Sequence, residues 1–235
     1  MTKLKGLKVL ITGGSSGIGK ATAEKLILAG AIVCITGRDK NKLDRVAGEI
    51  NAIPIHLDVT KYNNIAVKVL DAFHSMGGID VLVNNAGIGS FSKLESIKMA
   101  DFDEIFSTNV FGLTMMTQEV VKFFKTQQFG TIINIGSTAS TNGFASGSVY
   151  CASKFALRGL TYCWRSELRG DNIRVMLVNP SEVPTAFNNK QRTEREDEPK
   201  KLSSNEIAHA IISAIEMDDR GFINELNVWA TNPFN

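Results

Sequence analysis

Short β-branched runs alternate with longer helical patterns along most of the chain, and this alternation limits the possible folds more than any other feature of the sequence. It is the order of βαβ units, in which helices cover both faces of a parallel sheet. Strands are predicted at Lys8–Thr12, Ile32–Thr36, Ile53–His56, Val81–Asn84, Thr131–Ile135, Arg174–Val178 and Asn224–Val228. Helices are predicted at Ile18–Leu28, Asn41–Ile50, Asn63–Ser75, Phe102–Lys125, Val149–Arg169 and Glu206–Glu216. The sequence therefore predicts an α/β fold, a doubly wound parallel sheet of seven strands in a single domain over residues 1–235.

A charged segment interrupts the alternation between the sixth strand and the last helix. Asn188–Ser204 is rich in charged and amide side chains. Ser203 and Glu206 have the spacing of a capping box, which predicts the start of the last helix. Residues 188–204 are either a solvated surface loop or a substrate loop, because long connections in compact α/β domains commonly act as lids.

The distribution of charge excludes several classes of protein. The 26 basic and 24 acidic residues give a net charge of +2, which does not predict a nucleic-acid partner. No charged residue lies between Lys125 and Lys154, but this stretch is too rich in Ser, Thr, Asn and Gly for a membrane helix. The N-terminus lacks the apolar core of a signal peptide. We therefore expect a cytoplasmic protein without a membrane partner.

The cysteines and histidines do not predict a metal site. None of them has the spacing of a ligand pair or of a disulfide framework: Cys34, Cys151, Cys163, His56, His74 and His209. We expect no metal cofactor.

A glycine-rich turn follows the first predicted strand and leads directly into the first predicted helix. Gly13 permits a tight turn, Gly17 lets backbone N–H groups approach a pyrophosphate, and Gly19 allows the helix to pack closely on the strand. The alternative is a plain tight turn, but the order strand, turn, helix is the context of a dinucleotide-binding unit. A Rossmann-type fold follows, with cofactor contacts at Thr12, Gly13, Ser15, Ser16, Gly17, Ile18 and Gly19.

The residues after the second strand indicate which dinucleotide is bound. An NAD-selective site places an acidic residue there to bind the adenosine ribose, whereas this chain has Gly37 followed by Arg38. A guanidinium is suited to a 2′-phosphate, so NADP(H) is favoured over NAD(H). Alternatively, Arg38 pairs with Asp39 or Asp58, which leaves the preference undecided.

Tyr150 and Lys154 lie four residues apart near the start of a predicted helix, so both side chains lie on one helix face. A free phenol has a pKa of about 10, too high for an effective base near neutrality. An ammonium about 4 Å away would lower that pKa by roughly three units, close to neutral pH. Ser137 follows the fifth strand, where its hydroxyl could hold a substrate oxygen while Tyr150 exchanges a proton with it.

Over essentially its whole length the sequence resembles the single-domain branch of the short-chain dehydrogenase/reductase family. Thr12–Gly19 matches the family's TGxxxGIG turn, Asn84–Gly87 its NNAG motif, and Tyr150–Lys154 its YxxxK motif. Thirteen residues separate Ser137 from Tyr150, the usual spacing. The resemblance implies a tetrad in which Tyr150 is the acid/base, Ser137 orients the carbonyl, Lys154 lowers the tyrosine pKa and holds the nicotinamide ribose, and Asn109 bends its helix and supports a proton relay.

The resemblance also implies further cofactor contacts. Asn179–Thr185 is similar to the family's PGxVxT motif, in which the threonine holds the carboxamide, although Ser181 replaces the usual glycine. The substitution predicts a different backbone path near Thr185. The contacts implied in this way are Asp58, Val59, Asn85, Ala86, Gly87, Tyr150, Lys154, Pro180, Val183 and Thr185.

The leading hypothesis is an NADP(H)-dependent oxidoreductase that transfers a hydride between nicotinamide and a carbonyl or secondary alcohol. A narrower alternative is 3-oxoacyl-[acyl-carrier-protein] reductase, although Gln128 and Asp171 stand where those reductases tend to carry arginines. An alternative of another class is a dinucleotide-sensing protein without turnover, which usually lacks the Tyr/Lys pair.

The sequence leaves the substrate and the assembly open. We expect the walls of the substrate pocket to be formed by Ser90 and Phe91, by Thr138–Phe144 and by the stretch after Val183. Three further aromatic residues fit either an apolar pocket or the core: Phe144, Phe187 and Trp229. The family implies a homodimer or homotetramer through the helices that contain Asn109 and Tyr150, with apolar faces that include Phe111, Met115, Met116, Phe155, Leu160 and Trp164.

Overall fold

Seven strands form one parallel sheet in the order β3-β2-β1-β4-β5-β6-β7. The computed structural model describes residues 3–187, 195–196 and 198–232. The chain winds outward from β1 in one direction to β3 and then returns to start again at β4, beside β1. The strands are β1 (Lys8–Ile11), β2 (Ile32–Gly37), β3 (Ile53–His56), β4 (Val81–Asn84), β5 (Gly130–Ile135), β6 (Ile173–Pro180) and β7 (Glu225–Val228). The predicted Rossmann-type doubly wound sheet is confirmed.

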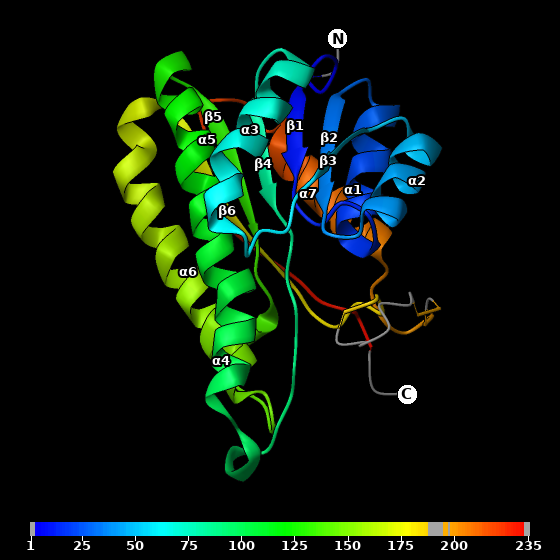
Figure 1. Ribbon diagram of the computed structural model, residues 1–235, viewed down its shortest axis with the longest axis vertical. Coiled ribbons are helices and arrows are strands. Elements are labelled where there is room, and N and C mark those ends of the chain that lie inside the picture. The colour runs from blue at the N-terminus through cyan, green and yellow to red at the C-terminus, as the bar shows by residue number, and fades with distance from the viewer. Residues whose placement is uncertain (1–2, 188–194, 197, 233–235) are drawn as a thin grey trace.

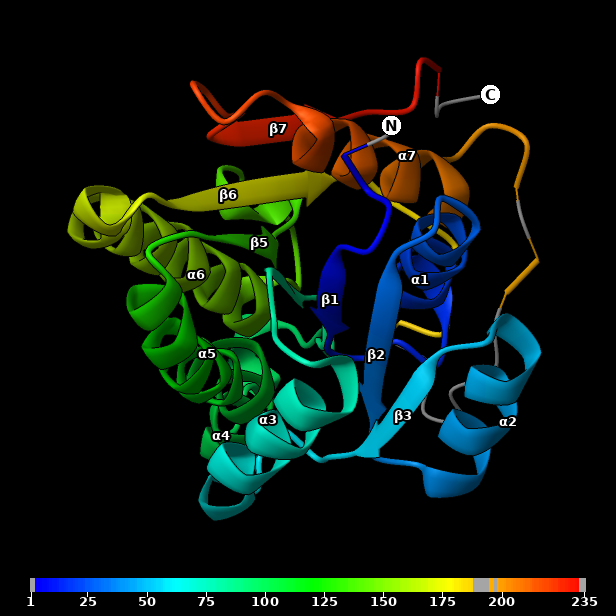
Figure 2. The same cartoon turned by 90° about the horizontal axis from the view of Figure 1, so that it is seen from above.

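Helices cover both faces of this sheet (Figures 1 and 2). On one face lie α1 (Gly17–Leu28), α2 (Lys40–Ile50) and α7 (Ser204–Glu216). On the other lie α3 (Tyr62–Met76), α5 (Leu113–Gln127) and α6 (Ser148–Leu168), and α4 (Met99–Phe106) continues the column of α5. Short 3₁₀ turns lie at Leu94–Ser96, Thr138–Ser140 and Arg169–Asp171.

Alternation of side chains along the strands divides the core into two parts. In β1, Val9 and Ile11 pack with the side chains of α1 and α7, whereas Leu10 packs with those of α3 and α5. All three are at most 1% exposed. Because both faces are buried, the strands are apolar throughout, as expected for a parallel sheet.

One predicted helix is present but contains an irregular segment that the apolar spacing did not predict. The sequence predicts a continuous helix over Phe102–Lys125, whereas the structure has α4, a π-helical segment at Ser107–Gly112, and then α5. The apolar spacing continues through the π turn, so periodicity does not reveal it. The widened turn lies against the loop after β3: a Cβ on Gly112 would lie 2.5 Å from the carbonyl oxygen of Val59.

The predicted substrate loop at 188–204 lies partly outside the described residues, so its role stays a prediction. Where the chain is described again, Glu182 and Glu198 both pair with Lys201. The predicted capping box is present: Ser203 accepts the N–H of Asn205, and Glu206 accepts the N–H of Ser203.

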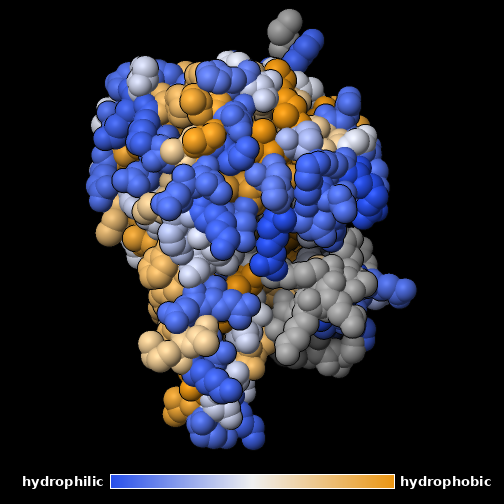
Figure 3. Space-filling view, in the orientation of Figure 1, coloured by the Kyte–Doolittle hydropathy of each residue, from blue (hydrophilic) through white to orange (hydrophobic). Residues whose placement is uncertain are grey.

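The described residues contain neither a helix that could span a membrane nor a cluster of metal ligands. None of the helices there has the length and apolar character needed to cross a bilayer. Within the same residues no three His, Cys, Asp or Glu side chains gather as metal ligands would. Figure 3 shows hydrophobic groups interspersed with hydrophilic ones on the projecting end of the molecule. Leu94 is 79% exposed, and Met99, the first residue of α4, is 74% exposed.

Candidate active site

A cleft of about 870 Å³ lies at the carboxyl ends of the strands, beside the neighbouring central strands β1 and β4. Doubly wound sheets bind their ligands at this point because the loops after the two central strands turn to opposite sides. Most of the residues singled out in the sequence line the cleft: Gly13, Ser15, Ser16, Gly17, Ile18, Arg38, Asp58, Val59, Asn85, Ala86, Gly87, Ser137, Tyr150, Lys154, Pro180, Val183 and Thr185. Thr12, Gly19 and Asn109 lie behind this lining.

The glycine turn is fastened to the loop after β4. The Thr12 hydroxyl accepts the N–H groups of Asn85 and Ala86, each at 3.0 Å. The Asn85 side chain donates to the carbonyls of Thr12 and Gly13, each at 3.0 Å. Gly13 has φ +65°, and a Cβ on Gly19 would lie 2.5 Å from the Asn85 amide nitrogen. Side chains at these two positions would therefore separate the two loops.

The first helix points its N-terminus at the cleft. Ser16 precedes α1 in an extended conformation, and its side chain makes no capping hydrogen bond. Gly17 and Ile18, in the first turn, line the cleft wall. A helix start of this kind offers backbone N–H groups and the positive end of the helix dipole, which suit a phosphate.

Two cations lie at the far end of the cleft, after β2, beside Asp39 and Asp58. Arg38 is exposed and lines the cleft together with Lys42, from the first turn of α2. Among the described residues no ion pair joins Arg38 to Asp39 or Asp58. Asp39 instead caps α2 by accepting the N–H of Lys42, and Asp58 accepts the N–H and hydroxyl of Thr60. The guanidinium is therefore available to an anionic ligand.

Tyr150 and Lys154 face the cleft from the first two turns of α6. Tyr150 is 7% and Lys154 6% exposed, and the Lys154 ammonium lies 5.8 Å from the centre of the Tyr150 ring. The ammonium donates to the carbonyl of Ile135, at the end of β5, at 2.8 Å. The predicted face of the helix is thus present, with the lysine fixed by the end of a strand.

The pKa values contradict one sequence-based expectation. Burial raises the pKa of Tyr150 to about 12, although a hydrogen bond with Ser137 acts to lower it. Burial also lowers the pKa of Lys154 to about 8. The expectation that Lys154 brings the Tyr150 pKa close to neutral is therefore wrong for this structure. It counted the attraction of an ammonium about 4 Å away but not the cost of desolvation, which here disfavours both charged forms.

Asn109 lies in the π-helical segment, and its side chain binds the loop after β4. Its amide donates to the carbonyl of Ile88 at 2.9 Å and to the Ser153 hydroxyl at 3.1 Å, and its oxygen accepts the N–H of Ile88 at 2.9 Å. A Cβ on Gly87 would lie 3.5 Å from the Asn109 oxygen and 3.9 Å from the Lys154 ammonium. The side chains of Asn109 and Lys154 therefore both lie close to Gly87 in the loop after β4.

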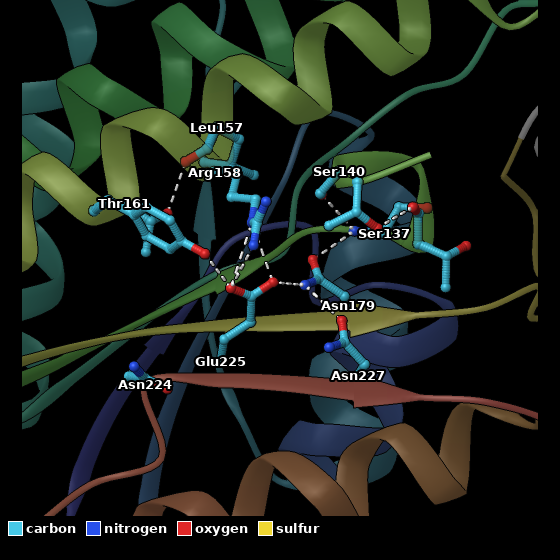
Figure 4. Close-up of polar contacts among 12 residues, drawn as sticks. Ser137, Ser140, Leu157, Arg158, Thr161, Asn179, Asn224, Glu225 and Asn227 are labelled. Atoms are coloured by element: carbon cyan, nitrogen blue, oxygen red, sulfur yellow. Dashed lines mark hydrogen bonds and ion pairs between the residues drawn. The ribbon is translucent and has the colours of Figure 1, made fainter. Parts of the chain in front are cut away.

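Ser137 is held through its backbone by a network that the sequence did not reveal (Figure 4). Its N–H donates to the Asn179 side-chain oxygen and to the Ser140 hydroxyl, each at 3.2 Å. The Asn179 amide donates to Glu225 at 2.9 Å and to Asn227 at 3.0 Å. The network thus joins the turn after β5 to β6 and β7.

Glu225 connects this network to the helix that carries Tyr150. Its carboxylate pairs with Arg158 at 3.2 Å and accepts the Tyr162 hydroxyl, both from α6. Asn179 and Glu225 are 46 residues apart and meet because β6 pairs with β7. The sequence offers one sign of this contact, which is that Asn179 is a polar residue within an otherwise apolar strand.

The motif that departs from the family pattern keeps an ordinary backbone. Ser181 is not among the described non-glycine residues with positive φ, and its N–H donates to the carbonyl of Val228 at 2.8 Å. Thr185 lies beside the glycine turn: a Cβ on Gly17 would lie 3.1 Å from the Thr185 methyl carbon. The serine therefore does not displace Thr185 from the cleft.

Comparison with known proteins agrees with this geometry. A profile of the short chain dehydrogenase family matches residues 7–196. A relative from Schizosaccharomyces pombe, described as an NADP-dependent 3-hydroxy acid dehydrogenase, is 32% identical over 92% of this chain and 89% of its own.

Two solved structures are similar over nearly the whole chain. An alcohol dehydrogenase from Thermococcus sibiricus, complexed with 5-hydroxy-NADP, has a TM-score of 0.88 and 26% identity over 96% of this chain and 97% of its own. A 3-ketoacyl-(acyl-carrier-protein) reductase from Brucella melitensis, complexed with NADH, has a TM-score of 0.88 and 29% identity over 99% of this chain and 100% of its own.

Proposed function

The chain belongs to the short-chain dehydrogenase family, and from this premise we propose that it is an NADP(H)-dependent oxidoreductase that interconverts a carbonyl compound and an alcohol. One observation carries the proposal: the glycine turn, Ser137, Tyr150 and Lys154 line one continuous cleft. That arrangement joins a dinucleotide site to a group able to exchange a proton.

The cleft fits a nicotinamide dinucleotide by the chemistry of its walls. Its volume of about 870 Å³ lies within the range of cofactor sites. The N-terminus of α1 would hold the pyrophosphate, and Asp58 and Val59 would lie along the adenine. Arg38, with Lys42 beside it, would hold a 2′-phosphate, since no acidic residue ends β2. These cations support NADP(H), whereas the neighbour bound to NADH shows that related chains accept the other form.

The residues around Tyr150 have distinct tasks in this proposal. When bound, NADPH supplies the hydride that the carbonyl carbon accepts, and NADP⁺ is left. Ser137 donates a hydrogen bond to the carbonyl oxygen, and Tyr150 transfers its phenolic proton to that oxygen. Lys154 presents positive charge behind the phenol, and Asn109 holds the loop that both groups face. The burial of Tyr150 and Lys154 excludes water from the proton transfer.

The state of Tyr150 supports reduction. With a pKa raised to about 12, the phenol carries its proton at neutral pH, which is the form that reduction consumes. Oxidation of an alcohol requires the phenolate instead, so its rate should rise with pH.

The test is a panel of ketones and aldehydes incubated with NADPH or NADH while nicotinamide absorbance is followed. We expect consumption of NADPH with at least one ketone, faster than consumption of NADH. Tyr150→Phe should reduce kcat by at least about 100-fold, the contribution typical of a positioned acid. Near-normal turnover by this variant would exclude the assigned role.

Carrier-protein thioesters remain the second candidate because of the likeness to the Brucella melitensis reductase. The surface offers few of the cations that such a partner would need. Gln128 is exposed and uncharged, and Asp171 pairs with Lys125 at 3.5 Å. An acidic carrier protein needs basic residues to dock. Preference for the carrier thioester over simple ketones would establish this alternative.

We also propose that the protein is a homodimer or homotetramer. The family supports this proposal, and Phe111 and Phe155, which are 50% and 46% exposed on the π-helical segment and α6, would lie at such an interface. Met116, from the same predicted face, is 1% exposed and belongs to the core. Light scattering on the eluted protein gives the number of subunits.

A further inference from the structure

Aromatic rings from three different loops surround Tyr150. The Phe187 ring centre lies 5.4 Å from that of Tyr150, and the Phe91 ring centre lies 5.7 Å from it on an edge-to-face contact. Phe144 extends the group with an edge-to-face contact to Phe91 at 5.4 Å. All four rings line the cleft. We call Phe91, Phe144 and Phe187 the aromatic compartment. Trp229, the other candidate from the sequence, is 59% exposed and is absent from the described lining.

Neighbouring glycines make room for two of these rings. A Cβ on Gly89 would lie 2.5 Å from the Phe187 ring, and a Cβ on Gly147 would lie 2.5 Å from the Phe144 ring. Real Cβ atoms do not approach that closely, so any larger residue would displace the ring. Phe187 and Phe144 therefore occupy positions that depend on the absence of a side chain opposite them.

The two loops that carry Phe91 and Phe144 are also joined to each other. The N–H of Ser92 donates to the carbonyl of Ser146 at 2.9 Å. Ser146 adopts a left-handed backbone with φ +64°, which directs the chain back toward α6. Phe91 and Phe144 remain 37% and 48% exposed, so their faces are open to a ligand.

The walls near these rings carry little charge. Of the cations in the described lining, Lys154 donates to the carbonyl of Ile135, and Arg38 and Lys42 lie at the far end after β2. Arg195 donates to the carbonyl of Thr185 and lies 3.9 Å from the Glu182 carboxylate. Each described cation of the cleft is therefore either engaged by another protein group, as Lys154 and Arg195 are, or placed at the end after β2.

From this arrangement we propose that the aromatic compartment selects an uncharged ketone or aldehyde that carries an aromatic ring next to its carbonyl, and that it rejects oxo acids. The inference rests on the proposed function, because it assigns the carbonyl to Ser137 and Tyr150. A flat ring would pack against Phe91 and Phe144 in edge-to-face contacts. A carboxylate in the same place would lose its hydration without gaining a partner.

The test uses three probes that differ in one group each. Acetylbenzoyl is an uncharged aryl diketone, biacetyl replaces its phenyl ring with methyl, and phenylglyoxylate replaces its acetyl group with a carboxylate. With NADPH we expect kcat/KM for acetylbenzoyl to exceed that for biacetyl by at least about 10-fold, a typical effect of one apolar group in a fitted pocket. It should exceed that for phenylglyoxylate by at least about 100-fold, because a buried carboxylate needs a partner.

A variant and its matched control locate the selectivity. Phe144→Ala removes a ring that is 48% exposed, so the fold should tolerate it, and the ratio of acetylbenzoyl to biacetyl should fall by about 10-fold. Phe129→Ala removes a ring of the same 48% exposure, directly before β5 and outside the described cleft lining, and should leave the ratio unchanged.

The outcomes separate this inference from the function on which it rests. Equal turnover of biacetyl and acetylbenzoyl, or efficient turnover of phenylglyoxylate, overturns the substrate class and leaves the oxidoreductase in place. An unchanged ratio in Phe144→Ala overturns the role of the compartment. If neither these probes nor the wider panel of ketones is reduced, the proposed function fails and the substrate class fails with it.

Discussion

Replacement of Asn179 by alanine should destabilise the protein more than any other single change in the network around Ser137. The side chain is fully buried at 0% exposure and makes three hydrogen bonds. The bond to the Glu225 carboxylate contributes about 2 kcal/mol, and each bond to a neutral partner contributes about 1 kcal/mol. The free energy of unfolding should therefore fall by about 4 kcal/mol.

The neighbours of Asn179 limit the loss to the bonds themselves. Glu225 keeps its ion pair with Arg158 at 3.2 Å, and the Ser137 N–H keeps the Ser140 hydroxyl at 3.2 Å. Neither group is left buried without a partner, so no further desolvation penalty arises. Because the Ser137 backbone loses one of its two anchors, kcat should fall as well.

Urea unfolding followed by circular dichroism measures the change. Asn227→Ala is the control, since it removes one bond of Asn179 from an exposed strand position and should cost about 1 kcal/mol or less. A loss below about 1 kcal/mol for Asn179→Ala would refute the claim that this network holds the turn after β5.

Three other changes test separate parts of the site. Arg38→Ala should raise KM for NADPH by about 10-fold and leave KM for NADH unchanged, because one charge-assisted contact to the 2′-phosphate is lost; equal effects on both would exclude phosphate recognition. Gly19→Ala should abolish dinucleotide binding measured by calorimetry, since its Cβ would lie 2.5 Å from the Asn85 amide; unchanged affinity would contradict the close packing. The native pKa of Lys154, about 8, lies below its unfolded value, so the unfolded chain binds more protons above pH 8 and stability from this group rises with pH. Relative to Lys154→Met, the wild type should gain stability between about pH 8 and 10 in urea unfolding; a constant difference would show that the ammonium is not desolvated.

Local sequence patterns predicted a strand, helix or turn correctly where its structure depends on residues adjacent in the chain. β3 has the predicted bounds, and the glycine turn joins β1 to α1 as expected, because Gly13 and Gly19 meet requirements set by their own neighbours. The apolar spacing did not predict the π-helical segment, although the family resemblance implied a bend at Asn109, whose side chain bonds to Ile88 in another loop. Such a contact leaves no trace in the spacing of apolar residues.

The sequence predicted which residues form the site better than it predicted their burial and pKa values. Tyr150 and Lys154 share a face as predicted, but their burial depends on segments distant in sequence, such as Phe187 beyond β6. Burial reverses the expected direction of the Tyr150 pKa. Asn179 and Glu225 could not be paired in advance, because the register of β6 against β7 brings them together.

In the proposed reaction, a hydride is transferred to a carbonyl within this cleft while Tyr150 supplies the proton. The direct measurement is reduction of a ketone with NADPH that carries deuterium at the transferable position, followed by mass spectrometry of the alcohol. We expect one deuterium on the carbinol carbon with the wild type and loss of product with Tyr150→Phe, which should still bind NADPH. Unlabelled alcohol, or undiminished labelled product from the variant, would contradict it.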